Sequence, residues 1–464
     1  EGLQNDVVAV TDKYADRGYL FADVMPVTDV QRAETTVDVT LEITEGPQAF
    51  IRRIEIAGNA RTRDKVVRRE LTLVEGNVFS SSRLQRSRRN LENLGFFEDV
   101  KLDTRRAAAP DQVDLFVDLK EKSTGAFTIG GGFSSVDGPI GVASISQGNL
   151  FGLGKRAAIS GQIGTRANRY NVVYTDPHLL DSDFLFEVRG FNTETDFRTY
   201  QGFNQDTLGG SVSLGHRLFE EVHGLVSYGF ERVKIKDLAD DAPFLIRRQA
   251  EESGGVSNTS SVSFALSRDT RDSFIEPTRG LRVRVAATVA GSVLGGDNEF
   301  TKYSADASQY YPLFWKVVGH LRGNFAYGEG YGDTDVLPVQ ERFFLGGSNS
   351  IRGFRNFSVS PKDPSGVGDG LTGGNKAWFA NAELLFPLYE PLRMRGVVFF
   401  DVGQVYDERH DFADLFKRTI KRSVGIGIRF NSPIGAIRLE WGFNLNPSEG
   451  EKFQVLHFSA GASF

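Results

Sequence analysis

The chain has 464 residues, a formal net charge of −6 and no cysteine. The absence of thiols excludes thiol catalysis, a disulfide framework and cysteine-based zinc or iron–sulfur sites. A mildly acidic charge without a long basic tract argues against nucleic acid as a partner. Glycine (51 residues) and aromatic side chains (11%) are abundant, as in β-rich proteins with many turns.

The sequence predicts no membrane-spanning helix, because no uninterrupted apolar stretch reaches the about 18 residues that one needs. Transmembrane β-strands remain compatible with this composition, since they alternate apolar and polar residues. The opening residues, EGLQNDVVAV, have neither the basic start nor the long apolar core of a signal peptide. They read as part of a helix, so we expect further sequence upstream.

Residues 1–122 predict small α+β modules. Apolar residues at helical spacing over 3–14 predict a first helix that ends near Gly18. Alternating strand patterns follow at 20–28 and 37–43.

A complete unit follows, in the order β-α-α-β-β. Its predicted elements are a strand and turn at 51–59, helices at 62–73 and 80–95, and strands at 96–104 and 113–122. The second helix begins with serines suited to an N-cap and ends on a glycine suited to a C-cap.

The two units resemble each other. Residues 16–28 align with 93–104, and 37–43 with 113–119, at an offset of about 76 residues. We therefore expect tandem modules of one small fold, the first without its opening strand and helix. The predicted domains are a partial module at 1–47, a complete last module at 48–122 and a β-domain at 125–464.

The β-domain alternates apolar and polar residues in strand after strand. In AIRLEWGFNL (436–445), Ile437, Leu439 and Trp441 share one face while Arg438 and Glu440 share the other. A soluble sandwich also alternates, but charged residues on the polar faces of many strands favour a membrane barrel with a wet lumen. At roughly 20 residues per strand and loop, the region predicts about 16 strands.

One loop stands out within this pattern, QERFFLGGSNSIRGF at 340–354. Its Arg352 offers a planar fork of donors that suits carboxylates. Two acids follow in strand-like settings, Glu383 in ANAELLFP and Asp401 in FFDVGQV. In a barrel these acids can face the lumen and pin the loop inside it. Spacing alone favours three unrelated charges instead.

The quoted segments resemble the BamA family of outer-membrane β-barrel assembly proteins. Residues 55–76, 93–104 and 110–122 are similar to a polypeptide-transport-associated (POTRA) module, and GAFTIGGGFSSVDGPIGVASISQGNLFGLGKR is similar to the first barrel strands of this family. IRGF with its flanks is the most specific part, and the likeness covers essentially the whole chain. The loop after IRGF is short for the family and has no cysteine pair.

The resemblance implies a 16-stranded antiparallel transmembrane barrel preceded by POTRA modules, in the outer membrane of a Gram-negative bacterium. The implied function is insertion of β-barrel proteins into that membrane, without catalysis, cofactor or metal. A lid loop at about 330–375 would then be locked in the lumen by Arg352, Gly353, Phe354, Glu383 and Asp401.

The resemblance also implies a weak seam between the first and last strands, where an incoming strand could add to an exposed edge. Glycines in the first strand weaken its pairing, although they also suit an ordinary bulge. The predicted seam residues are Phe127, Ile129, Gly130, Gly131, Gly132, Phe458, Gly461 and Phe464.

Implied partners are unfolded outer-membrane β-barrel clients, accessory outer-membrane lipoproteins (BamD-like), periplasmic chaperones and the lipid bilayer. A cluster on the second helix of the last module, Arg83, Arg86, Arg88 and Arg89, is a candidate docking surface, although a solvated helix face is its simpler interpretation.

Other functions remain open from the sequence. A related translocation or secretion pore, either TamA-like or of the two-partner secretion type, is the main alternative. An enzyme barrel would need a nucleophile or paired carboxylates beside a histidine, and no such grouping stands out. The six histidines show no close metal-binding spacing. A passive porin is disfavoured by the modules.

Overall fold

The computed structural model describes residues 2–31, 36–240, 242–274, 276–363, 370–414, 420–432 and 435–461. The chain divides into two compact units, Glu1–Ala126 with Gln147–Arg156, and Phe127–Ser146 with Ala157–Phe464. No helix among the described residues is long and apolar enough to cross a membrane.

The first unit begins with helix α1 (Gly2–Asp16) and the antiparallel pair β1 (Asp23–Gln31) and β2 (Thr36–Thr44). The predicted helix end is confirmed: Gly18 has φ +97°, and its N–H donates to the Ala15 carbonyl at 3.1 Å.

The complete module contains β3 (Phe50–Ala57), α2 (Asp64–Arg68), α3 (Ser81–Asn93), β4 (Phe97–Arg106) and β5 (Gln112–Glu121). The predicted β-α-α-β-β order is confirmed, and the sheet order is β3-β5-β4, with β3 and β5 parallel. Ser80 caps α3 by accepting from the Arg83 N–H.

Helix α2 is shorter than the predicted stretch 62–73. The chain leaves the helix because Thr72 is held by α3: its N–H donates to Ser87 Oγ at 2.8 Å, and its hydroxyl donates to the Arg83 carbonyl at 2.8 Å. Leu71 and Leu73 thereby enter the core of the module, which also contains the buried face of β5.

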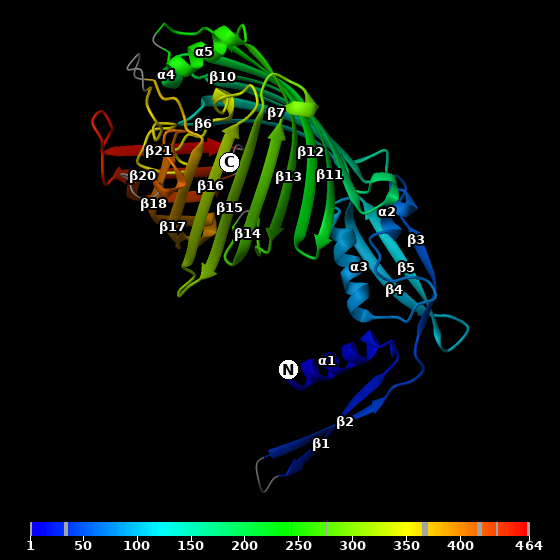
Figure 1. The fold of residues 1–464 in the computed structure, drawn as a ribbon. Coiled ribbons are helices and arrows are strands. Elements are labelled where there is room, and N and C mark those ends of the chain that lie inside the picture. The colour runs from blue at the N-terminus through cyan, green and yellow to red at the C-terminus, as the bar shows by residue number, and fades with distance from the viewer. Residues whose placement is uncertain are drawn as a thin grey trace. The chain divides into compact units, whose positions relative to one another are not determined.

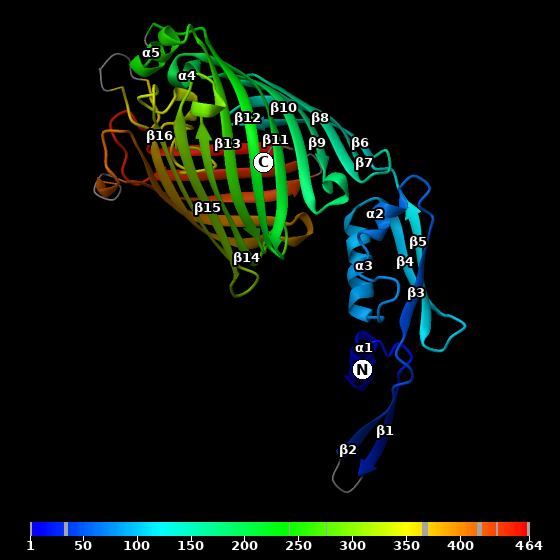
Figure 2. The same ribbon diagram turned by 45° about the vertical axis from the view of Figure 1, so that its right-hand side comes forward.

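The second unit is a closed antiparallel barrel of sixteen strands, β6 to β21, which confirms the predicted number (Figures 1 and 2). The strands are β6 (Gly125–Ser134), β7 (Gly138–Leu150), β8 (Lys155–Gly164), β9 (Ala167–Asp176), β10 (Phe184–Asp196), β11 (Asn204–Phe219), β12 (Val222–Lys236), β13 (Val256–Asp269), β14 (Gly280–Ala290), β15 (Phe300–Pro312), β16 (Val318–Gly330), β17 (Lys376–Tyr389), β18 (Met394–Tyr406), β19 (Lys421–Ser432), β20 (Gly435–Asn444) and β21 (Gln454–Gly461).

Strand alternation separates an apolar exterior from a polar lumen. On β20, Leu439 and Trp441 are 40% and 42% exposed, while Glu440 and Asn444 are completely buried. The same alternation leaves large apolar side chains exposed on neighbouring strands, as expected of a surface that contacts lipid. The end of the β7–β8 hairpin belongs to the first unit, where Asn149 donates to Thr62 Oγ1 at 2.8 Å.

Helices α4 (Arg198–Gln201) and α5 (Phe244–Glu252) lie at one end of the barrel (Figures 1 and 2). Beside them lies the lid loop between β16 and β17, which the structure describes over residues 331–363 and 370–375. Phe203, Ile246 and Val339 form a small core between them. Short 3-10 turns occur at η1 (Leu179–Asp181), η2 (Ser292–Leu294), η3 (Val339–Glu341), η4 (Glu390–Leu392) and η5 (Phe412–Asp414).

Candidate functional site

The tip of the lid loop lies inside the barrel. Leu345, Ile351 and Phe354 of the loop are buried against Phe379 of β17 and Val405 of β18. This apolar contact holds the loop against the wall. It places the side chain of Arg352, which lies between Ile351 and Gly353 in the chain, in the lumen.

Arg352 is 1% exposed and binds three carboxylates from three strands. Its Nε and Nη2 donate to the two oxygens of Asp401 at 2.7 and 2.6 Å, and its backbone N–H donates to the same carboxylate at 2.9 Å. Its Nη1 donates to Glu383 at 2.6 Å and Glu440 at 3.2 Å. The guanidinium also lies 3.6 Å from the centre of the Phe399 ring.

Further basic groups complete this cluster. Arg429 donates to Glu383 at 2.7 Å and to Glu440 at 2.8 Å, and Arg438 donates to Glu440 at 2.6 Å. His320 Nδ1 lies 2.9 Å from Oε2 of Glu383, which also accepts from Arg429 Nη1 at 3.0 Å. Three guanidinium groups thus face three carboxylates, and the buried charges compensate one another.

The loop backbone is held as well as its side chain. Asn381 on β17 donates to the Ser350 carbonyl at 2.7 Å and to Asp401 at 2.8 Å. Gly353 has φ +86°, which favours glycine, and it packs directly on β20: a Cβ on Gly442 would collide with the Gly353 nitrogen.

Phe354 completes the predicted lock residues. It is 2% exposed, and Lys421 Nζ lies 5.7 Å from the centre of its ring. The structure therefore brings together Arg352, Gly353, Phe354, Glu383 and Asp401 at one site. That this site locks the lid during function stays a prediction.

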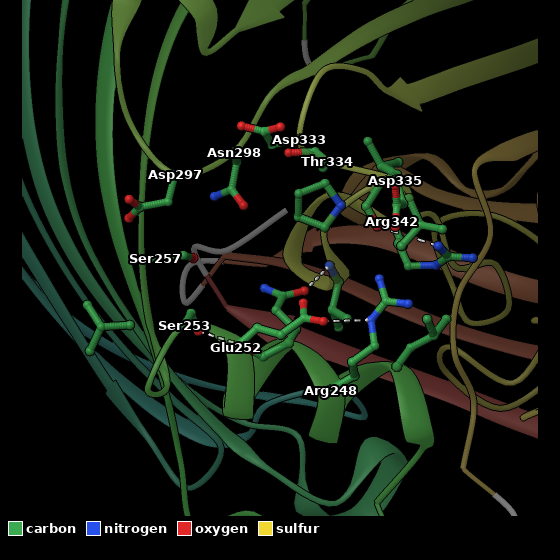
Figure 3. Close-up of a pocket in the computed structure, with 17 residues that line it drawn as sticks. Arg248, Glu252, Ser253, Ser257, Asp297, Asn298, Asp333, Thr334, Asp335 and Arg342 are labelled. Carbon is green, nitrogen blue, oxygen red and sulfur yellow. Dashed lines mark hydrogen bonds and ion pairs between the residues drawn. The ribbon is translucent and has the colours of Figure 1, made fainter.

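A second anchor holds the stem of the lid loop. Arg342 is buried; its Nη1 and Nη2 donate to Glu408 at 2.7 and 2.9 Å, and its Nε donates to the Gly373 carbonyl at 3.3 Å. Arg342 lines a cavity of about 640 Å³ between the lid stem and α5 (Figure 3). Arg248 and Glu252 of α5 form an ion pair on its wall, with 3.3 Å between their charged atoms.

The predicted seam lies between β21 and β6. Within the described part of β21, two residue pairs join these strands, Ser459 with Ser134 and Ala460 with Phe133. By contrast, eight pairs join β20 to β21. On the outer surface, the rings of Phe133 and Phe458 have centroids 5.8 Å apart.

Close backbone approach explains two of the seam glycines. A Cβ on Gly132 would collide with the Ala460 carbonyl oxygen. Gly461 has φ +119° and packs on the Gly132 Cα. Larger residues at either position would separate the strands at their point of contact.

The remaining seam residues are less constrained. Gly130 has open space where a Cβ would lie, and at Gly131 a Cβ would make an ordinary contact at 3.5 Å. Phe127 and Ile129 are 66% and 72% exposed on β6. Phe464 lies outside the described residues. The opening of this seam stays a prediction.

The arginines of α3 are exposed side chains. Arg88 donates to Glu92 one turn away at 2.9 Å, while Arg83, Arg86 and Arg89 lie on the same solvated helix. Their exposure is compatible with docking but does not test it.

Sequence reasoning missed several members of the lumenal cluster. Alternation placed Arg438 and Glu440 on a polar face of β20, and Arg429 on that of β19, but nothing in their spacing linked them to Arg352. His320 carried no motif at all. Their positions in the barrel wall depend on strand register, which a single sequence does not specify.

Comparison with known families decides the assignment. The family described as "Omp85 superfamily domain" matches residues 149–464, and a POTRA family described as "Surface antigen variable number repeat" matches 1–46 and 49–122. The chain belongs to the Omp85 superfamily. Most of the barrel strands lie within the first match, and the preceding modules lie within the second.

Two relatives of known sequence are named as assembly factors. "Outer membrane protein assembly factor BamA" from Nitratidesulfovibrio vulgaris is 32% identical, with 100% of this chain and 57% of that protein covered. BamA from Neisseria meningitidis serogroup B is 28% identical, with 98% and 62% covered. This chain therefore spans 57% and 62% of the lengths of these two relatives.

A solved structure has the same fold. The crystal structure of BamA from Haemophilus ducreyi lacking POTRA domains 1–3 matches with a TM-score of 0.82 at 24% identity, covering 99% of this chain and 92% of that one.

Proposed function

We propose that the chain folds and inserts β-barrel proteins into the outer membrane of a Gram-negative bacterium, with its POTRA modules in the periplasm. The main support is the contrast at the seam: two residue pairs join β21 to β6 within the described part of β21, against eight between β20 and β21. A weakly paired edge is a template for an added strand.

The proposed mechanism is non-enzymatic. A client strand pairs with the edge of β6 or β21, and the client sheet grows there beside a disturbed bilayer. The free energy comes from the client, which pairs its backbone groups and exposes its apolar face to lipid. The protein lowers the barrier, and the buried ion pairs at Arg352 anchor the lid loop to β17 and β18 of the wall.

The partners follow from this role. Unfolded β-barrel clients reach the barrel from periplasmic chaperones, and extended client segments add to the open edges of the POTRA sheet. Accessory outer-membrane lipoproteins (BamD-like) dock on the last module, where Arg86, Arg88 and Arg89 offer an exposed basic helix face. Charge reversal at these arginines should reduce co-purification of such a lipoprotein without changing barrel folding.

A depletion experiment separates this role from that of a secretion pore. On depletion in its own cells, proteomics of the outer membrane should show falling levels of many unrelated barrel proteins. Loss of a single secreted protein, with other barrels unchanged, would indicate a pore instead.

A further inference from the structure

We propose that the lid loop holds the seam closed from inside, because it hydrogen-bonds at once to the last strand, β21, and to the residue that follows the first strand, β6. His457 of β21 and Asn356 of the lid loop are the positioning residues of this bridge. The idea deepens the proposed function, since it assigns the lid control over the opening through which clients would leave.

The first contact joins the lid to the last strand. The Gly353 N–H donates to His457 Nε2 at 3.2 Å, and His457 is 2% exposed. For this bond, Nε2 must carry its lone pair, so the ring acts as an acceptor. A buried amide without that acceptor would be left unsatisfied, which disfavours separation of the lid from β21.

The second contact joins the lid to the end of the first strand. Asn356 Nδ2 donates to the Ser135 carbonyl at 3.3 Å, directly after β6. The Asn356 side chain lies close to Gly347, where a Cβ would collide with Asn356 Oδ1. Ser135 is itself bonded across the seam, since its N–H donates to the Phe458 carbonyl at 3.0 Å.

These contacts form a closed circuit of hydrogen bonds around the seam between β21 and β6. Gly353 binds β21, Asn356 binds the end of β6, and Ser135 binds the residue next to His457. Because two residue pairs join the described parts of the seam strands, two additional bonds are a large share of the closing interactions among the described residues.

The lid can serve as a brace because its tip is fixed elsewhere. Arg352 ties it to Asp401 of β18 and Glu383 of β17, strands that have long registers with their neighbours. The seam strands are thereby linked through the loop to a firmly paired part of the wall. Displacing the lid would release both strands in one step.

The test measures the seam directly, without any client. Because the chain has no cysteine, spin labels attach only at introduced positions, Ile145→Cys on β7 and Leu439→Cys on β20. Both are outward-facing residues one strand away from the seam, 61% and 40% exposed. Distances are recorded by pulsed electron paramagnetic resonance in lipid nanodiscs.

With the native lid we expect one narrow distance distribution. His457→Leu and Asn356→Ala should each add a longer, broader population, raising the open-to-closed ratio by about five- to tenfold. His457→Gln keeps an acceptor for the Gly353 amide and should restore the narrow distribution. Ser358→Ala, which removes a hydroxyl that donates within the loop to the Arg355 carbonyl, is the matched control and should not change it.

Unchanged distances in both lid variants would overturn the bridge, as would a His457→Gln variant as open as His457→Leu. If His457→Leu does not fold, as judged by heat-modifiable mobility, Asn356→Ala decides alone. A seam that opens in these variants while client levels in cells stay normal would support the bridge and count against the insertase proposal.

Discussion

At the scale of single residues, the site depends on how a buried arginine is satisfied. Arg352 uses its side chain and its backbone N–H on the same carboxylate, Asp401, and two further acids share its charge. A guanidinium matches this arrangement because its donors lie in one rigid plane. Removing Arg352 takes from the buried Asp401 carboxylate the guanidinium that compensates its charge.

Arg352→Ala should lower the unfolding free energy of the barrel by roughly 3–5 kcal/mol, because the buried Asp401 carboxylate would lose the guanidinium that binds both of its oxygens. Glu383 and Glu440 would keep their ion pairs with Arg429. Heat-modifiable mobility measures the barrel, and protease cleavage within 340–354 measures the lid. Arg355→Ala removes an exposed arginine three residues away and is the control. Native behaviour of Arg352→Ala in both measurements would contradict the lock.

Gly442→Ala adds one methyl group where β20 meets the lid tip. The new Cβ would collide with the Gly353 nitrogen, so we expect the tip to be displaced at a cost of about 1–3 kcal/mol. Hydrogen exchange of the peptide containing Gly353 should become faster. Gly323→Ala, at a strand position with open space around its Cβ, should leave that exchange rate unchanged.

The sequence predicts part of this site. Arg352, Glu383 and Asp401 were recognised through the motif around them, and their ion pairs are present. Glu440 was not linked to them, because it lies 88 residues beyond Arg352 and reaches it only when the sheet closes. Charges that meet across a lumen leave no local pattern.

At the scale of elements, the lid loop has two anchors with different exposure. Arg352 at the tip is surrounded by protein, while the stem pair is asymmetric: Arg342 has a side chain 1% exposed and Glu408 one 33% exposed. Removal of Glu408 therefore leaves a buried charge, whereas removal of Arg342 leaves a charge that is partly exposed.

Glu408→Gln should destabilise the lid stem more than Arg342→Met. The first variant leaves a buried guanidinium with carbonyl acceptors alone, whereas the second leaves a carboxylate that can turn to water. In a double-mutant cycle, we expect a coupling of about 1–3 kcal/mol in thermal unfolding of the barrel. Equal single effects and no coupling would indicate that the stem pair has no role.

Asp16 links α1 to the start of α3. Burial alone would raise the pKa of its carboxyl, but hydrogen bonds from the backbone and hydroxyl of Ser82 and from Ser80 and Ser81 lower the pKa below 3.8. A lowered folded-state pKa gives a contribution that is present above pH 3.8 and lost as pH falls through the folded value.

Hydrogen exchange therefore tests this contact. The Ser82 amide, which donates to Asp16 at 2.6 Å, should lose protection on acidification below pH 3.8 in the native chain. In Asp16→Asn the protection should be weaker at neutral pH and should not change over that acid range. An identical acid dependence in both proteins would remove Asp16 as the cause.

Elements were predicted where a period repeats without interruption. The barrel strands follow the two-residue alternation that lipid on one side and water on the other impose, and α3 has clear end signals. Helix α2 was overestimated because the contact of Thr72 with α3 is a tertiary one. The helix propensity of the sequence continues past Arg68, but packing against α3 ends the helix there.

At the scale of the whole molecule, sixteen strands close into a barrel whose last joint is its weakest described one. The number of strands could be predicted from length and alternation, because each strand crosses the same thickness of membrane. The register at the seam could not, since it depends on how far the sheet is sheared when it closes.

A disulfide across the seam tests the central claim most directly. Phe133→Cys and Ala460→Cys replace one of the two described residue pairs, and the chain has no other cysteine. The purified protein in lipid vesicles receives an unfolded β-barrel client, and client folding is followed by protease protection. We predict that oxidation stops insertion and that reduction restores it. Equal insertion with the seam oxidised and reduced would contradict the account.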